Sequence, residues 1–131
     1  MKKIILIATM LLTFGMANAQ KISNVESGGK LQICNLSSQN NKSGCETIQS
    51  SGVAVASLGN NKIAIVYTSG KLQVCNVSDQ NNTSGCQTIE NSGVSNVQMS
   101  GDQRIIITYS SGKKTACNVS SQNNTSGCST L

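Results

Sequence analysis

The chain has no histidine, no proline and no tryptophan, and aromatic residues make up only 2% of its 131 positions. Histidine is the commonest general base near neutral pH and a frequent zinc ligand. Its absence argues against ordinary acid–base catalysis and excludes mixed Cys/His zinc sites. Charged residues are also few, at 11%, which argues against long helical bundles and coiled coils.

The five carboxylates of the chain suggest no catalytic pair, because they do not recur at equivalent positions. They are Glu26, Glu46, Asp79, Glu90 and Asp102. No nucleophile stands in a recognisable relation to a base, and the cysteines form no C-x-x-C motif. We therefore predict that the protein is not an enzyme and that it has no catalytic residues, no metal site and no cofactor.

Basic residues outnumber acidic ones, ten against five, and give a formal net charge of +5. They are scattered along the chain, and Tyr67 and Tyr109 are the only aromatic residues beyond the N-terminal segment. Nucleic-acid binding needs a basic stripe with aromatic stacking platforms, so we predict no nucleic-acid partner.

The first 19 residues have the pattern of a bacterial export signal. Two lysines precede an apolar run from Ile4 to Met16, and Ala17-Asn18-Ala19 fits a small-residue cleavage site. The run is shorter than the roughly 20 residues that span a bilayer. We predict a signal peptide at 1–19, a periplasmic or secreted protein, no membrane span after cleavage, and one all-β domain at 20–131.

A twelve-residue unit that begins and ends with cysteine occurs three times, starting at Cys34, Cys75 and Cys117. The first cysteine advances by 41 and then by 42 residues, which divides the chain into repeats of about 20–49, 50–90 and 91–131. A Gly-Lys turn precedes each unit, at Gly29, Gly70 and Gly112. The repeat is therefore the basic structural unit.

Each full repeat has the pattern of four short antiparallel strands separated by Gly, Asn and Ser turns, with no helical period. In the second repeat the expected strands are 53–58, 63–68, 72–77 and 86–89. In the third they are 94–99, 105–109, one around Cys117, and 128–131. The first repeat supplies only 21–26, 31–36 and 45–48, which makes 11 strands in all. Several strands are apolar on both faces, which indicates sheets packed between neighbouring sheets.

This unit of about 41 residues, in which Lys-Ile-Ala-Ile-Val-Tyr is followed by Ser-Gly-Lys-Leu-Gln-Val-Cys-Asn-Val, resembles a β-propeller blade. The resemblance covers Lys21 to Leu131. It implies a propeller-like stack of about three four-stranded antiparallel repeats. Three repeats of this length also fit a β-trefoil or a β-prism, so all three folds stay open at this point.

Six cysteines behind an export signal indicate disulfides. The equal spacing in each repeat favours local pairs: Cys34–Cys45, Cys75–Cys86 and Cys117–Cys128. In the chain-entropy treatment each closed loop of this size stabilises the fold by about 2.5–3 kcal/mol. A small core without aromatic bulk needs such crosslinks.

Three nearly identical polar loops separate the paired cysteines, and we predict that they form the binding site. The candidate residues are Gln39, Asn40, Asn41, Gln80, Asn81, Asn82, Gln122, Asn123 and Asn124. Their amides suit a glycan or a protein ligand, and three copies would give avidity. The alternative is that Asn, Ser and Gly serve only the turn backbone.

We therefore expect an exported, non-catalytic binding protein, with a structural or self-assembling subunit of the periplasm or cell surface as the alternative. A propeller closes only with about four or more blades. Three stacked repeats would leave two apolar sheet faces in water, and exposed apolar patches of that size mark interfaces. We predict a homo-oligomer, with a dimer of two three-repeat chains favoured.

Overall fold

The computed structural model describes residues 20–131, and the predicted signal peptide lies outside these residues. The described chain forms 11 strands and no helix. The strands are β1 (Gln20–Val25), β2 (Leu31–Leu36), β3 (Lys42–Gln49), β4 (Val53–Leu58), β5 (Lys62–Tyr67), β6 (Leu72–Val77), β7 (Thr83–Glu90), β8 (Val94–Ser100), β9 (Arg104–Tyr109), β10 (Lys114–Val119) and β11 (Thr125–Thr130). The all-β prediction is confirmed.

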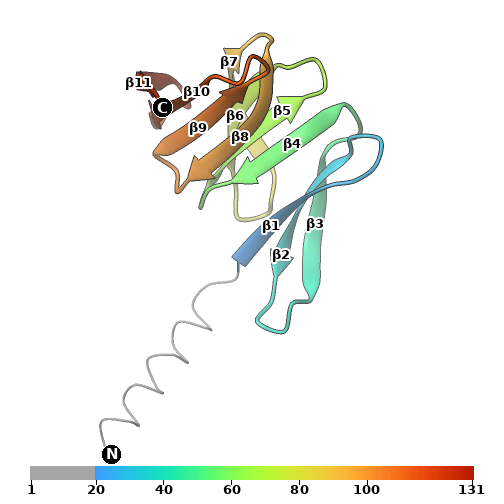
Figure 1. Cartoon of the computed structure of the whole chain (residues 1–131). Helices are drawn as coiled ribbons and strands as arrows, with labels where there is room; N and C mark the ends of the chain where they lie inside the picture. Colours follow the sequence, from blue (N-terminus) through green and yellow to red (C-terminus); the bar gives the residue numbers. More distant parts are fainter. Residues whose placement is uncertain (1–19) are drawn as a thin grey trace, which may run out of the picture.

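The strands form three antiparallel sheets, one for each sequence repeat (Figure 1). Sheet 1 has the order β1-β2-β3, sheet 2 has β4-β5-β6-β7, and sheet 3 has β8-β9-β10-β11. Neighbours in each sheet are consecutive in sequence, because turns of a few residues allow only local antiparallel pairing. Sheet 1 has three strands, as expected for the first repeat.

Sheet 2 lies between the other two sheets and is covered on both faces. Ile63 and Ile65 of β5 pack with residues of sheet 1, including Leu31 and Ile33. Ala64 and Val66 of the same strand point to the opposite face of sheet 2, where they pack with residues of sheet 3. The double-sided apolar pattern of β5 thus builds two cores, neither of which contains a fully buried aromatic side chain.

This stacking distinguishes among the three folds that the sequence left open. In a β-trefoil or a β-prism the repeats turn one side towards a shared central core. Here the middle sheet shares both of its faces with neighbours, as a propeller blade does. The sheets remain open, with no closure of sheet 3 onto sheet 1 among residues 20–131.

Backbone hydrogen bonds join the sheets at the end where the Gly-Lys turns lie. Val53 N donates to the Gly29 carbonyl at 3.0 Å, and Val94 N donates to the Gly70 carbonyl at 3.0 Å. A Cβ on Gly29 would lie 2.5 Å from Gly52 N, and its φ is +81°. Only glycine allows this close approach between successive sheets.

The last strand of each sheet begins earlier than the sequence indicated. We expected 45–48, 86–89 and 128–131, whereas β3, β7 and β11 start at Lys42, Thr83 and Thr125. A register shift accommodates the glycine before each second cysteine, for example between Ile33 and Asn35 in the β2–β3 pair. The Ser-Gly before each second cysteine resembles a loop in the sequence, but a β-bulge lets it remain part of the last strand.

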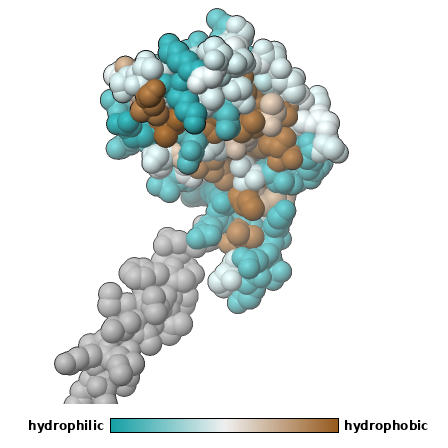
Figure 2. Space-filling view, viewed as in Figure 1, coloured by the Kyte–Doolittle hydropathy of each residue, from teal (hydrophilic) through white to brown (hydrophobic). Residues whose placement is uncertain are grey.

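Apolar atoms form a band across the middle of the face in Figure 2, and hydrophilic atoms surround them. The lower lobe in this view is the β2–β3 hairpin of sheet 1, which is mostly hydrophilic. Leu131 is the one large hydrophobic side chain in residues 20–131 that is strongly exposed, at 67%. No helix in these residues could cross a membrane.

Candidate functional site: asparagine loops between the sheets

The three Gln-Asn-Asn loops share one backbone conformation. In the first loop, Asn40 N donates to the Ser37 carbonyl at 2.9 Å, and Asn41 N donates to Ser37 Oγ at 3.1 Å. Ser78 and Ser120 make the same bonds in the other loops. A serine at the start of a loop satisfies the loop's own N–H groups in this way.

The middle asparagine of each loop adopts a left-handed backbone. Its φ is 65° at Asn40 and 68° at both Asn81 and Asn123. Asparagine tolerates this conformation better than other residues that carry a Cβ. The interpretation of these residues as turn chemistry is therefore correct for the backbone of all three loops.

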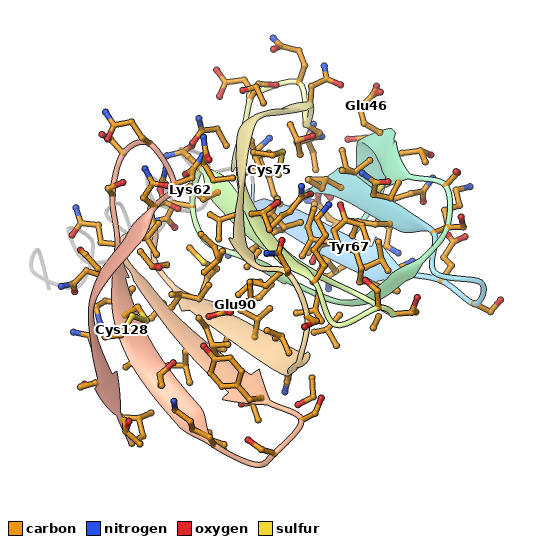
Figure 3. The ribbon with its side chains drawn as sticks, turned by 90° about the horizontal axis from the view of Figure 1, so that it is seen from above. Glu46, Lys62, Tyr67, Cys75, Glu90 and Cys128 are labelled. Atoms are coloured by element: carbon orange, nitrogen blue, oxygen red, sulfur yellow. A yellow bond between two sulfur atoms is a disulfide. The ribbon has the colours of Figure 1, made fainter. Side chains whose placement is uncertain are left out.

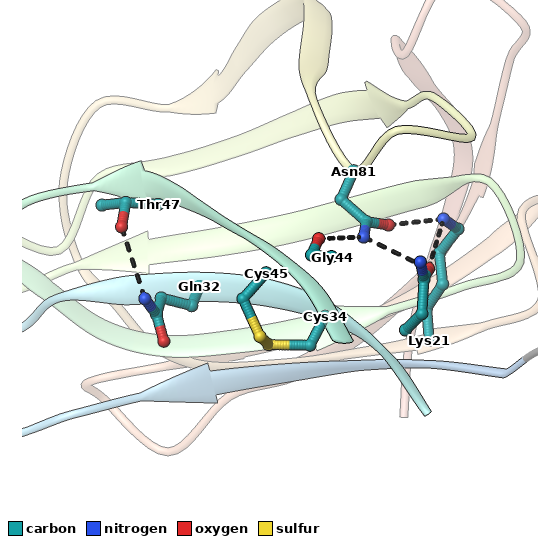
Figure 4. Close-up of a disulfide and its surroundings, with 8 residues drawn as sticks. Lys21, Gln32, Cys34, Gly44, Cys45, Thr47 and Asn81 are labelled. Carbon is teal, nitrogen blue, oxygen red and sulfur yellow. Dashed lines mark hydrogen bonds between the residues drawn. A yellow bond between two sulfur atoms is a disulfide. The ribbon is translucent and has the colours of Figure 1, made fainter. Parts of the chain in front are cut away.

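The side chain of Asn81 joins sheet 2 to sheet 1 (Figure 4). Its Nδ2 donates to the Gly44 carbonyl at 2.8 Å and to Asn35 Oδ1 at 3.2 Å. Its Oδ1 accepts a hydrogen bond from Lys21 Nζ. Lys21 also donates to the Asp79 carbonyl at 3.2 Å, so the whole tip of the loop is fastened to sheet 1.

The same joint recurs between sheet 3 and sheet 2. Asn123 Nδ2 donates to the Gly85 carbonyl at 2.8 Å, and Asn123 Oδ1 accepts from Lys62 Nζ. Lys62 also donates to Asn76 Oδ1 at 3.0 Å and to the Ser121 carbonyl at 3.3 Å. Three acceptors therefore match the three N–H donors of an ammonium group whose side chain is only 9% exposed.

We call the receiving residues a socket: Lys21, Asn35 and Gly44 form socket 1, and Lys62, Asn76 and Gly85 form socket 2. The glycine has a positive φ of 59° in both sockets, and a Cβ there would lie within 2.9 Å of the socket asparagine. Asn81 and Asn123, which fill the sockets, are 0% exposed. Each socket is thus shaped for one asparagine side chain.

The nine predicted binding residues fall into two groups. Seven of them are exposed: Gln39, Asn40, Asn41, Gln80, Asn82, Gln122 and Asn124. Asn81 and Asn123 are buried, and their amides are engaged between sheets. The structure gives these two a structural role, and the binding role of the exposed seven stays a prediction.

The sequence reasoning did not assign a role to the socket residues. Lys62 counts there among the scattered basic residues and Lys21 only as the start of an expected strand, while Asn35 and Asn76 are only members of the repeated twelve-residue unit. The available signal was their equivalent position, because Lys21 stands as far before Cys34 as Lys62 stands before Cys75, 13 positions in each repeat. Recurrence of a lysine beside an otherwise apolar strand marks a contact that each repeat makes again.

The three local disulfides are confirmed as Cys34–Cys45, Cys75–Cys86 and Cys117–Cys128. In each pair the first cysteine is buried on the last but one strand of its sheet, and the second is exposed on the outer strand. Cys128 lies on β11 (Figure 3). Each disulfide therefore holds the outer strand, and with it the loop, against its sheet.

The two tyrosines lie at the opposite end of the strands from the loops. Lys62 of β5 pairs with Asn76 beside the loop, whereas Val66 pairs with Leu72 at the far end, next to Tyr67. Lys71 and Lys113 lie 5.5 Å from the ring centroids of Tyr67 and Tyr109. These rings provide no stacking platform for a ligand at the loops.

Tyr67 and Tyr109 differ in the partner of the hydroxyl. Tyr67 Oη donates to Gln73 Oε1 at 2.8 Å, and Tyr109 Oη donates to Glu90 Oε2 of the neighbouring sheet at 3.0 Å. Desolvation raises the pKa of Tyr67 above 10.0. Desolvation also raises the pKa of Tyr109, and the hydrogen bond to Glu90 raises it further.

No group of three or more Cys, His, Asp or Glu side chains in residues 20–131 could hold a metal ion. Glu46 and Glu90 lie on different sheets, and Glu46 projects from the outer strand of sheet 1 (Figure 3). The Asp102 carboxylate accepts hydrogen bonds from Asn60 N and Asn61 N at 2.8 and 2.9 Å, so it links the β8–β9 turn to the β4–β5 turn.

No family model matches the chain, and no curated protein matches it in sequence. The fold is similar to part of the crystal structure of human WBSCR16, an RCC1-like protein of the propeller type. The TM-score is 0.55 and the sequence identity 13%, over 76% of this chain and 31% of that chain. The chain thus spans about a third of that structure. The similarity concerns the fold alone, and it agrees with an architecture of repeated blades.

Proposed function

We propose that the protein is an exported, non-catalytic binding protein that contacts a polar ligand through the row of loop tips. The observation that carries this proposal is the burial of Asn81 and Asn123, which anchors two loops to the preceding sheets. Gln39, Gln80 and Gln122 remain exposed at equivalent positions of the three loops. A binding edge that is already ordered loses little entropy when a ligand arrives.

The side chains of Gln39, Gln80 and Gln122 favour a polymer of neutral polar units as the ligand, with a glycan as the first candidate. Each glutamine amide offers donors and an acceptor without a charge, which suits hydroxyl or peptide groups. Three copies of one contact suit a ligand that repeats, because linked contacts add avidity. The tyrosines lie at the other end of the strands, so recognition would rest on hydrogen bonds and not on stacking.

Export is supported by the N-terminal sequence pattern and by the disulfides. Three disulfides within 112 described residues are typical of proteins that fold in an oxidising compartment. We therefore propose that the protein works in the periplasm or outside the cell.

The binding proposal is tested with a glycan array and a triple variant, Gln39→Ser, Gln80→Ser and Gln122→Ser. Loss of three exposed amides should weaken binding of the selected polysaccharide about tenfold or more, while the melting temperature stays within about 2 °C. The control carries Gln87→Ser and Gln98→Ser, which alter exposed glutamines on strands β7 and β8. A wild-type protein that binds no glycan, or a triple variant with full affinity, would refute the proposal.

The second candidate function is a structural or self-assembling subunit. The observation that favours it is that the two ends of the stack differ. Sheet 1 carries the exposed loop asparagine Asn40, whereas on sheet 3 Asn118 and Gly127 stand at the positions of the socket residues with no loop asparagine of residues 20–131 beside them.

A further inference from the structure

Within residues 20–131 a loop asparagine fills a socket of the preceding sheet twice. The loop asparagine and the socket residues, however, occur in all three repeats. Asn81 fills socket 1 and Asn123 fills socket 2. The third loop asparagine is Asn40, which is exposed on sheet 1. The third set of socket residues is Arg104, Asn118 and Gly127 on sheet 3, and we call it socket 3. No residue of 20–131 fills it.

The free loop already has the conformation of the two engaged loops. Asn40 has a φ of 65° against 68° in the buried asparagines, and Ser37 makes the same bonds as its counterparts. The Ser38 carbonyl stands where the Asp79 carbonyl accepts from Lys21 in the first joint. No rearrangement of the loop is needed for it to enter a socket.

Socket 3 also has the geometry of a filled socket. Gly127 has a φ of 58°, against 59° for Gly44 and Gly85. A Cβ on Gly127 would lie 2.8 Å from Asn118 Nδ2, as in the other sockets, but the additional loop asparagine found near Gly44 and Gly85 is missing there. Arg104 pairs with Asn118 in the strand register, as Lys62 pairs with Asn76.

From these two unpaired halves we infer that the protein associates head to tail with a second copy of itself, with Asn40 of one chain in socket 3 of the next. Asn40 Nδ2 would donate to the Gly127 carbonyl, and Asn40 Oδ1 would accept from Arg104. The guanidinium supplies more donors than the lysine ammonium of the other sockets, so it can also reach the Ser38 carbonyl and Asn118 Oδ1. The inference deepens the second proposed function and does not depend on ligand binding.

The expectation of two apolar outer faces is wrong at the positions where polar residues replace the apolar residues of the inner faces. Asn24 on sheet 1 stands at the repeat position of Ile65, and Lys114 on sheet 3 stands at that of Leu72. Apolar burial therefore contributes less between chains than within a chain. A larger share of the affinity falls on the asparagine joint.

A contact between unlike ends is heterologous, so it produces a closed ring or an open filament. Two chains joined at both ends would stack six sheets in a ring, since each chain supplies three. The favoured dimer of the sequence prediction is thus the smallest closed product of this joint.

Sedimentation equilibrium of the oxidised protein from about 1 μM to 1 mM tests the inference. We expect wild type to form dimers or longer species, and Asn40→Ala and Arg104→Glu each to weaken association about tenfold or more. Both positions are exposed, so neither change removes a buried contact. Asn41→Ala, which alters the adjacent exposed side chain of the loop, is the matched control and should associate like wild type.

A mixture of Asn40→Ala and Arg104→Glu chains gives the decisive result. The first variant keeps a working socket 3 and the second keeps a working loop. The mixture should therefore form a species of two chains, and no longer species, at concentrations where each variant alone is monomeric. A wild-type monomer over the whole range, variants that associate like wild type, or a mixture that stays monomeric would each overturn the inference. A glutamine triple variant that loses ligand but still associates separates this result from the binding proposal.

Discussion

The loops at 37–41 and 120–124 have the same sequence, Ser-Ser-Gln-Asn-Asn, yet they lie in different surroundings. Both hold the middle asparagine at a left-handed φ, 65° at Asn40 and 68° at Asn123. Asn123 is fully buried against sheet 2, whereas Asn40 is exposed. The comparison shows that local sequence sets the backbone of the loop, and that the place of its sheet in the stack decides what the side chain contacts.

The largest expected difference in the free energy of unfolding is that between Asn123→Ala, at a buried loop asparagine, and Asn40→Ala, at an exposed one. Asn123→Ala loses two hydrogen bonds, leaves the buried Lys62 short of an acceptor and strains the left-handed backbone, so it should lower the free energy of unfolding by about 4 kcal/mol. Asn40→Ala loses only the conformational preference, about 1 kcal/mol. Urea unfolding at a concentration where the chain is monomeric measures both. Equal losses would contradict the comparison.

The disulfides should show no such difference between sheets. Cys34–Cys45 and Cys75–Cys86 close loops of the same length, with a sequence separation of 11 in each. Because a disulfide acts mainly on the unfolded chain, each Cys→Ser pair should cost about 2.5–3 kcal/mol. Thermal and urea unfolding of the two double variants checks this. A much larger loss in sheet 2 would mean that the disulfide acts through packing between sheets.

Socket 2, which Asn123 fills, and socket 3, which no residue of 20–131 fills, can be compared by the loss of stability when Gly85 or Gly127 is replaced by alanine. Gly85→Ala places a Cβ 2.9 Å from Asn76 Nδ2 and 3.7 Å from Asn123 Nδ2, and hydrogen bonds hold both of these side chains. We expect a loss of about 2 kcal/mol there. At Gly127 the neighbour Asn118 is exposed and no loop asparagine lies beside it, so Gly127→Ala should cost about 1 kcal/mol, mostly from its positive φ. Unfolding curves that rank the two variants in the opposite order would contradict this account.

The smallest expected effect concerns the tyrosines at the far end of the strands. Glu90→Gln removes the carboxylate beside Tyr109, so the pKa of Tyr109 should fall towards its ordinary value of 10.0 while that of Tyr67 stays raised. Ultraviolet titration of phenolate absorbance measures both. A raised pKa means that the folded state holds the proton more tightly, so stability is complete below about pH 10 and decreases as the pH rises beyond it. The wild type should lose stability there more steeply than Glu90→Gln.

Much of the fold could be predicted because its determinants are local. Strands such as β5 and β6 show β-branched runs between Gly and Asn turns, and equal cysteine spacing selects the disulfides. The early starts of β3, β7 and β11 could not be predicted, because the Ser-Gly before each second cysteine resembles a loop and becomes a bulge only after pairing.

The joints could not be predicted, because their partners are distant in sequence. Lys21 and Asn81 are separated by 60 positions, and Lys62 and Asn123 by 61. Nothing in the loop sequence distinguishes the exposed Asn40 from the buried Asn123, because the two loops are identical. Only the order in which the sheets stack decides which two of the three are buried.

A double-mutant cycle between Lys62 and Asn123 tests the central claim most directly, namely that the loop asparagine holds successive sheets together. The free energy of unfolding is measured for wild type, Lys62→Met, Asn123→Ala and the double variant. A parallel cycle pairs Lys62→Met with Asn124→Ala, because Asn124 is the exposed neighbour in the same loop. We predict a coupling energy of about 1.5–3 kcal/mol in the first cycle and about zero in the second. Losses that add to within about 0.5 kcal/mol in both cycles would contradict the joint.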